Sequence, residues 1–234
     1  MHLRISWKYV AAFLVLNGVV SELHEQAHIT TGRLISGCYG PRDFNVWEGC
    51  ASGSAALPFA APLAGPLFSY LVMWWGAWLL LRGRSAAMRS VGFSLVFAPL
   101  PFARVFTALM GGGDERMVLA RLLGDALGSG ALRWLAVMLA LAFCAPPVVA
   151  AWRALSNRHR GWYVAGFCVL PLIVIWIYKF KLLNTLLADG LLADPVLLGT
   201  PALVLVVFAG MCALTVLWKP WLEQLEARPA HLNC

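Results

Sequence analysis

Two histidines one helical turn apart form the most specific chemical pattern in this chain. His24-Glu25-Gln26-Ala27-His28 fits the pattern H-E-x-x-H and ends an apolar run that starts near Tyr9. On a helix, His24 and His28 project from the same face, so both imidazole rings can reach one metal ion. A catalytic zinc site needs three protein ligands and a water molecule. The pattern therefore predicts one zinc ion held by both histidines, with Glu25 as the catalytic base.

A third zinc ligand is expected near the same membrane face as His28, because two histidines leave a catalytic zinc one protein ligand short. The third apolar run ends in Gly111-Gly112-Gly113-Asp114-Glu115, where glycine allows the backbone to bend toward the metal. Asp114 is the first carboxylate after that bend and is the predicted ligand. Glu115 is the alternative ligand, because its longer side chain can reach from one residue away. A simpler explanation of both residues is charge–dipole attraction at the start of the next helix.

Other polar residues also lie at membrane depth. One stripe on the first helix has residues spaced four, three and four apart: Asn17, Ser21, His24 and His28. Such a stripe must face the bundle interior or a water-filled cavity. Arg104 lies within the third apolar run, and an ionisable residue inside a span is a functional candidate by default. Arg104 is therefore expected either to stabilise the transition state as an oxyanion donor or to pair with a carboxylate, with snorkelling to the interface as the alternative.

Membrane-spanning helices must position these residues. Of the 234 residues, 61% are hydrophobic and only 12% are charged, whereas a soluble domain has about 25% charged residues. The composition therefore predicts an all-α, polytopic membrane protein. Runs of about twenty apolar residues mark spanning helices. Six such runs occur, at 9–28, 58–81, 88–110, 131–152, 161–181 and 196–218.

The whole chain, 1–234, is expected to form a single integral membrane domain, because the longest polar connection is 29–57. The first run is expected to be a retained helix, since no A-x-A-like signal cleavage site follows it. Lys and Arg at the ends of spans explain the net charge of +7 without a nucleic-acid partner. The expected partners are the lipid bilayer and a membrane protein or peptide substrate.

The distribution of basic residues predicts the orientation. With six spans, the side that holds the N-terminus carries ten Lys and Arg residues, and the opposite side carries seven. The first group is Arg4, Lys8, Arg82, Arg84, Arg89, Arg153, Arg158, Arg160, Lys219 and Arg228; the second is Arg33, Arg42, Arg116, Arg121, Arg133, Lys179 and Lys181. The positive-inside rule then favours a cytoplasmic N-terminus in the inner (plasma) membrane of a bacterium.

The connection 29–57 holds two further features. Cys38 and Cys50 bracket it, and they can form a disulfide if the loop is extracytoplasmic. Residues 44–47 are expected to form an ordinary loop, with a short strand that holds an extended substrate by strand addition as the alternative. Three cysteines in the spans are expected to be packing residues: Cys144, Cys168 and Cys212.

Together, three elements resemble the site-2 protease family of intramembrane zinc metalloproteases. They are His24-Glu25-Gln26-Ala27-His28 on an early span, Ala64-Gly65-Pro66-Leu67 on the next span, and Asp114 after the third. The resemblance covers about residues 10–125. It implies a three-helix metalloprotease core and a zinc ion bound by both histidines and Asp114.

The resemblance places that core within residues 1–125 and leaves 126–234 as additional transmembrane helices. The implied activity is zinc-dependent endopeptidase cleavage of membrane-associated substrates, in sites that generally open toward the cytosol. The family's asparagine upstream of Asp114 has no clear counterpart here, which leaves the oxyanion partner open. Two alternatives are a zinc-binding membrane protein without protease activity, such as a sensor or inactive relative, and a zinc-dependent hydrolase of a lipid or another amide or ester.

Overall fold

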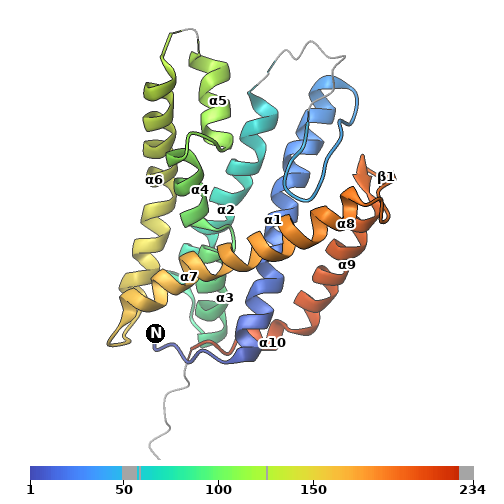
Figure 1. The fold of residues 1–234 in the computed structure, drawn as a ribbon. Helices are drawn as coiled ribbons and strands as arrows, with labels where there is room; N and C mark the ends of the chain where they lie inside the picture. Colours follow the sequence, from blue (N-terminus) through green and yellow to red (C-terminus); the bar gives the residue numbers. More distant parts are fainter. Residues whose placement is uncertain (49–56, 58, 125, 227–234) are drawn as a thin grey trace, which may run out of the picture.

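The structure, a computed structural model, describes residues 1–48, 57, 59–124 and 126–226, most of which are helical (Figure 1). The helices are α1 (Trp7–Ser36), α2 (Ala60–Arg82), α3 (Ala86–Phe97), α4 (Pro101–Leu109), α5 (Asp114–Leu123), α6 (Ser129–Ala154), α7 (Arg160–Ile175), the π-helix η1 (Trp176–Leu183), α8 (Asn184–Ala188), α9 (Ala202–Leu217) and α10 (Lys219–Leu222). In the described part of the chain, only β1 (Pro195–Leu197) and β2 (Thr200–Pro201) are strands, and they form a short antiparallel hairpin. The predicted helical fold is confirmed, apart from this hairpin.

Four segments have the length and composition of membrane-spanning helices: Ala60–Arg82, Ala86–Leu109, Ser129–Ala154 and Arg160–Ala188. A hydrocarbon core of about 30 Å needs roughly twenty such residues, so the structure supports a membrane protein. The other two predicted spans correspond to α1 and α9. Helix α1 is 30 residues long but carries several charged residues, and α9 has only 16 residues. Six spans are therefore not established by length and composition.

Two predicted boundaries are wrong. Residues 29–36, predicted as loop, form the last two turns of α1, because their polar side chains do not break a helix. The helix instead ends where Gly37 adopts a left-handed conformation with φ of 81°. Residues 196–201, predicted to begin the last span, belong to the β1–β2 hairpin, and α9 starts only after Pro201. The histidine pair consequently lies within α1 rather than at its end.

The helix that carries the histidines runs through the middle of the bundle, packed against α2 and α9 (Figure 1). An aromatic cluster fixes its first half against α3 and α7. Phe167 of α7 lies 5.1 Å from Phe13 of α1 and 5.0 Å from Phe93 of α3, measured between ring centroids. Such edge-to-face pairs add about 0.5–1.5 kcal/mol each beyond the burial of their apolar area. This packing sets the position of α1, and hence of the histidines.

The third span is broken at Pro99 and Pro101, between α3 and α4. Leu100 has a positive φ of 55° between α3 and α4. The break frees backbone carbonyls, and Asn17 of α1 donates a hydrogen bond from Nδ2 to the carbonyl of Ala98. This bond confirms that Asn17 of the polar stripe faces the bundle interior.

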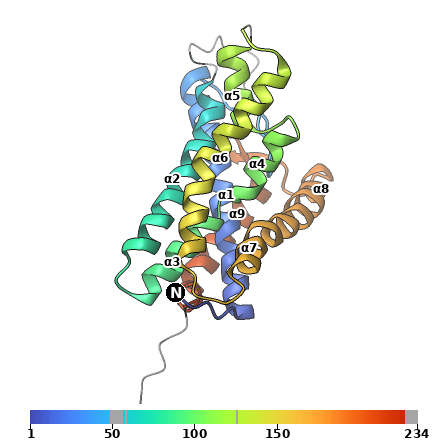
Figure 2. The same ribbon diagram turned by 90° about the vertical axis from the view of Figure 1, so that its left-hand side faces the viewer.

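A single oblique rod is formed by α7, η1 and α8. In Figures 1 and 2 it crosses the side of the bundle that α1 and α4 form. A cavity lies between the oblique rod and the break in the third span, lined by Leu172 and Ile175 of the rod and by Ala98 and Leu100 at the break. The candidate site opens into this cavity.

Candidate metal centre

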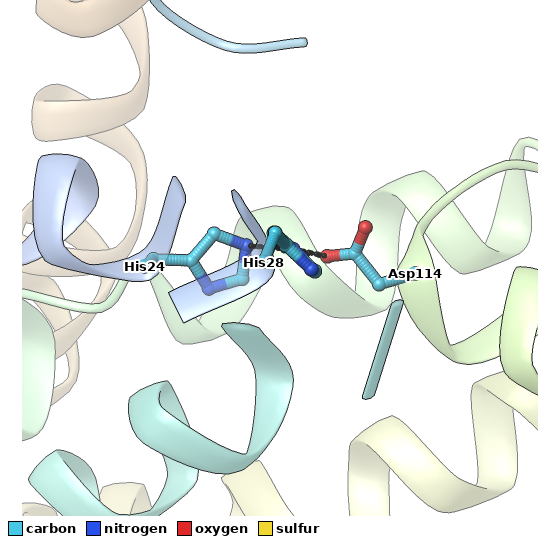
Figure 3. A group of neighbouring side chains, drawn as sticks. All are labelled: His24, His28 and Asp114. Atoms are coloured by element: carbon cyan, nitrogen blue, oxygen red, sulfur yellow. Dashed lines mark hydrogen bonds and ion pairs between the residues drawn. The ribbon is translucent and has the colours of Figure 1, made fainter. Parts of the chain in front are cut away.

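Three side chains from two distant segments meet beside α2 (Figure 3). His24 and His28 project from α1, and Asp114 is the first residue of α5. The two Nε2 atoms are 3.1 Å apart, and they lie 3.3 and 3.5 Å from Asp114 Oδ2. Among the described residues, this is the one group of histidine, cysteine and carboxylate side chains arranged to hold a metal ion. The predicted juxtaposition of Asp114 with both histidines is present.

The separations of the three ligand atoms fit a zinc ion. Zinc bonds to nitrogen and oxygen are about 2.0–2.1 Å long, so neighbouring ligand atoms in a tetrahedral site lie about 3.3 Å apart. The observed separations of 3.1, 3.3 and 3.5 Å bracket that value. Three protein ligands also leave a fourth position for water or substrate, as in catalytic rather than structural zinc sites.

Helix α2 orients both imidazole rings. His28 Nδ1 lies 2.7 Å from the carbonyl oxygen of Ala61, and His24 Nδ1 lies 3.0 Å from the hydroxyl oxygen of Ser69. In the tautomer that carries its proton on Nδ1, each ring donates to its partner on α2. Both Nε2 lone pairs then face Asp114, and Nε2 of His24 also lies 3.1 Å from Arg104 Nη2. Hydrogen bonding of this kind at Nδ1 is typical of metal-binding histidines.

The approach of α2 to the histidines depends on Gly65. A Cβ atom at that position would lie 2.2 Å from His28 Nε2 and 2.6 Å from His24 Cε1. These distances are shorter than any van der Waals contact, so the rings would have to move. The Ala64-Gly65-Pro66-Leu67 segment of α2 is therefore packed directly against the histidine pair of α1.

We expect Gly65→Ala to abolish zinc binding, because the added methyl group displaces both imidazole rings. Zinc content per chain after purification in detergent measures the effect. Gly210→Ala is the matched control, because a Cβ there meets no atom within 4 Å, and it should retain wild-type zinc. Full zinc occupancy in Gly65→Ala would show that the observed position of the rings is not the metal-binding one.

Arg104 positions the carboxylate of Asp114, the candidate third ligand. Its Nη1 lies 3.3 Å from Asp114 Oδ2 and 2.8 Å from Glu115 Oε1. The Tyr70 hydroxyl donates a hydrogen bond to the same Glu115 oxygen. Glu115 is thus engaged by Arg104 and Tyr70 and is not part of the three-residue group, which favours Asp114 as the third ligand.

The charge on Asp114 suits a metal ligand. Burial raises the pKa of its carboxyl group, but its contacts with His24 and His28 and the charge of Arg104 outweigh burial and hold the pKa well below its usual range. The carboxylate is therefore ionised at neutral pH. Arg104 Nη2 also lies 3.1 Å from His24 Nε2, and the two carboxylates Asp114 and Glu115 offset this neighbouring positive charge.

A cavity of about 240 Å³ lies beside the ligands. It has room for several water molecules at about 30 Å³ each. The ionisable side chains that line it are His24, Glu25, Arg104, Asp114 and Lys179. Glu25 is 9% exposed and adjoins a predicted ligand in the sequence, so the predicted base lines the same cavity as the predicted metal ligands.

The loop after α1 closes the site on the side of His28. The Trp47 ring stacks on the His28 imidazole, with centroids 5.4 Å apart and planes 21° apart. Arg42 holds this loop through two hydrogen bonds to Glu22, of 2.8 and 3.0 Å, and both side chains are buried. Removing one partner of such a buried pair typically costs about 3–5 kcal/mol. The sequence analysis did not identify this ion pair.

Residues 44–47 form no strand, in agreement with the favoured interpretation of an ordinary loop. Arg42 and Trp47 form an isolated antiparallel bridge around a tight turn, in which Asp43 Oδ1 accepts hydrogen bonds from the backbone amides of Asn45 and Val46. Phe44 is buried against η1 and α9, so it is not available to bind a substrate strand. Cys38 is disulfide-bonded. Its predicted partner, Cys50, lies outside the described residues.

Lys179 is a functional candidate that the sequence analysis missed. In the sequence, Lys179 contributed only to the number of basic residues on one side of the membrane. In the structure it is 7% exposed and lines the cavity. Its Nζ donates a 2.8 Å hydrogen bond to Ser21 Oγ of the polar stripe. The sequence did contain a signal for Lys179, because an ionisable residue near the end of an apolar run is a functional candidate in the same way as Arg104.

Comparisons with protein-family models, curated proteins and solved structures found no match for this chain. The likeness to site-2 proteases therefore remains one of short sequence elements. The function must be inferred from the residues and geometry of the site itself.

Proposed function

We propose that this protein is an intramembrane zinc metalloprotease that hydrolyses peptide bonds of membrane-associated substrates. The central observation is that His24, His28 and Asp114 place three candidate ligand atoms 3.1 to 3.5 Å apart, and that His24 and Asp114 line a cavity. Glu25 lines the same cavity. A carboxylate base next to an open three-ligand metal site is the arrangement that metal-assisted peptide hydrolysis requires.

In the proposed hydrolysis, a bound metal ion and the protein's own side chains have different roles. A bound zinc ion would supply Lewis acidity that polarises the scissile carbonyl and lowers the pKa of a water molecule. Glu25 takes the proton of the attacking water and delivers it to the leaving amine. Arg104 and Glu115 hold Asp114 in place, and α2 holds the histidine rings.

The place of the cavity in the fold supports a membrane-associated substrate. Its walls include the Ala86–Leu109 and Arg160–Ala188 segments, both of which qualify as spans. Apolar side chains from these segments complete the lining: Leu100, Leu172, Ile175, Trp176 and Phe180. An apolar peptide segment matches these walls better than a charged, soluble substrate does.

Cleavage of a spanning reporter peptide in proteoliposomes tests the proposal. The zinc-loaded protein should cut the reporter, a zinc chelator should stop cleavage, and added zinc should restore it. Zinc binding without cleavage across a library of apolar spanning reporters would favour the non-proteolytic alternative. Release of fatty acid from the vesicle lipid instead would favour a lipid hydrolase.

We further propose that the N-terminus faces the cytoplasm. Arg42 and Lys179, two of the seven basic residues assigned to the opposite side, are buried, which widens the difference in exposed positive charge. A cysteine introduced at Ser54, with the native cysteines replaced, should react with a membrane-impermeant maleimide in intact cells. Labelling only after lysis would reverse the orientation and open the metal site toward the cytosol.

A further inference from the structure

The cavity contains a buried cation that the mechanism above does not use. Lys179 is 7% exposed, and Ser21 is the one hydrogen-bond partner found for its Nζ within the described residues. A lysine ammonium group has three N–H donors. Two donors therefore remain beyond Ser21 in a side chain that lines the same cavity as His24 and Glu25.

The backbone around Lys179 is unusual. It lies in η1, and the amide of Asn184 donates to the carbonyl of Lys179, five residues earlier, as in a π-helix. Such wider turns are rare and occur frequently at functional sites. Lys181, two residues later, is exposed and lies over the Trp176 ring. The π-helical stretch thus directs one lysine into the bundle and leaves the other outside.

The two cationic side chains that line the cavity differ in whether they are paired with a carboxylate. Arg104 is bound to the carboxylates of Asp114 and Glu115. Lys179 forms no ion pair with a carboxylate in the described part of the chain, although Glu25 lies near enough to interact with it electrostatically. Lys179 is therefore the cation free to meet negative charge that develops on a substrate.

On the basis of the proposed function, we propose that Lys179 donates a hydrogen bond to the scissile carbonyl oxygen and stabilises the oxyanion. When the water oxygen bonds to the carbonyl carbon, the π electron pair moves onto the carbonyl oxygen, and Lys179 retains its protons. When the C–N bond breaks, the pair returns and the amine leaves with the proton carried by Glu25.

Steady-state kinetics with Lys179→Met tests this role. We expect kcat to fall by about 10²–10³-fold, as for removal of a single oxyanion donor, with KM and zinc content close to wild type. Lys181→Met removes the same charge from the exposed face of η1 and should behave like wild type. If Lys179→Met misfolds, Lys179→Gln keeps an N–H donor for Ser21 and should show a smaller loss in kcat.

A binding measurement separates this role from a structural one. The ligands are a capped, amidated phosphinic tetrapeptide with leucine and alanine side chains, and its neutral hydroxyethylene isostere. In zinc-loaded protein, Lys179→Met should weaken binding of the phosphinic peptide by about tenfold or more and change binding of the isostere by less than about threefold. An equal loss for both ligands, or unchanged binding of both, would overturn the proposal.

The two measurements also separate this proposal from the proposed function. If wild type binds the phosphinic peptide through Lys179 but cleaves no peptide, the protease assignment fails and the anion-binding role of Lys179 stands. If wild type cleaves peptides and Lys179→Met retains the wild-type kcat, the protease assignment stands and the role of Lys179 fails. Recovery of binding only when the ligand has a free C-terminal carboxylate would overturn the oxyanion role, because Lys179 would then bind a chain terminus.

Discussion

Replacing Glu25 by glutamine is expected to lower kcat for peptide hydrolysis by about 10²–10⁴-fold while zinc remains bound. Glutamine preserves the size and hydrogen bonding of the side chain, but it cannot accept the proton of the attacking water. Glu25 is not one of the three ligand residues, so the metal should be unaffected. The reporter-cleavage rate in proteoliposomes, measured together with zinc content, checks both parts.

Glu48→Gln is the matched control, because Glu48 is an exposed carboxylate outside the cavity. It should cleave the reporter at the wild-type rate. Undiminished turnover by Glu25→Gln would reject Glu25 as the base. Loss of zinc from Glu25→Gln would instead assign Glu25 to the metal site.

Asp114→Ala is expected to weaken zinc binding by more than about 100-fold, because loss of a supporting residue alone commonly costs 10–100-fold. Glu115→Gln should have a smaller effect, since Glu115 acts on the metal only through Arg104 and Asp114. Competition with a zinc chelator at fixed pH measures both affinities. A loss confined to Glu115→Gln would transfer the ligand role to Glu115, and no loss in either variant would leave the site with two known ligands.

The histidine pair was predictable because its geometry is local. A spacing of four residues on a helix places His24 and His28 together whatever surrounds them. Asp114 was predictable from connectivity, since the third span returns the chain to the level of the histidines. Gly111 and Gly113, with φ of 80° and 84°, provide the turn that brings Asp114 there.

Other parts of the site depend on contacts between distant segments, which hydropathy does not encode. The ion pair of Glu22 with Arg42 requires the loop after α1 to fold back along that helix. The inward position of Lys179 depends on how the Arg160–Ala188 segment is rotated against the bundle, for which an apolar run gives no signal. The end of α1 was misplaced because polar residues reduce hydropathy without stopping a helix, and the actual stop is Gly37.

The metal content of the purified protein tests whether His24 and His28 bind zinc. Wild type should contain about one zinc ion per chain, and the double variant His24→Ala, His28→Ala should contain almost none. The double variant His2→Ala, His159→Ala removes two exposed histidines outside the metal site and should keep wild-type zinc. Full zinc retention after loss of both His24 and His28 would show that these two residues do not hold the metal ion.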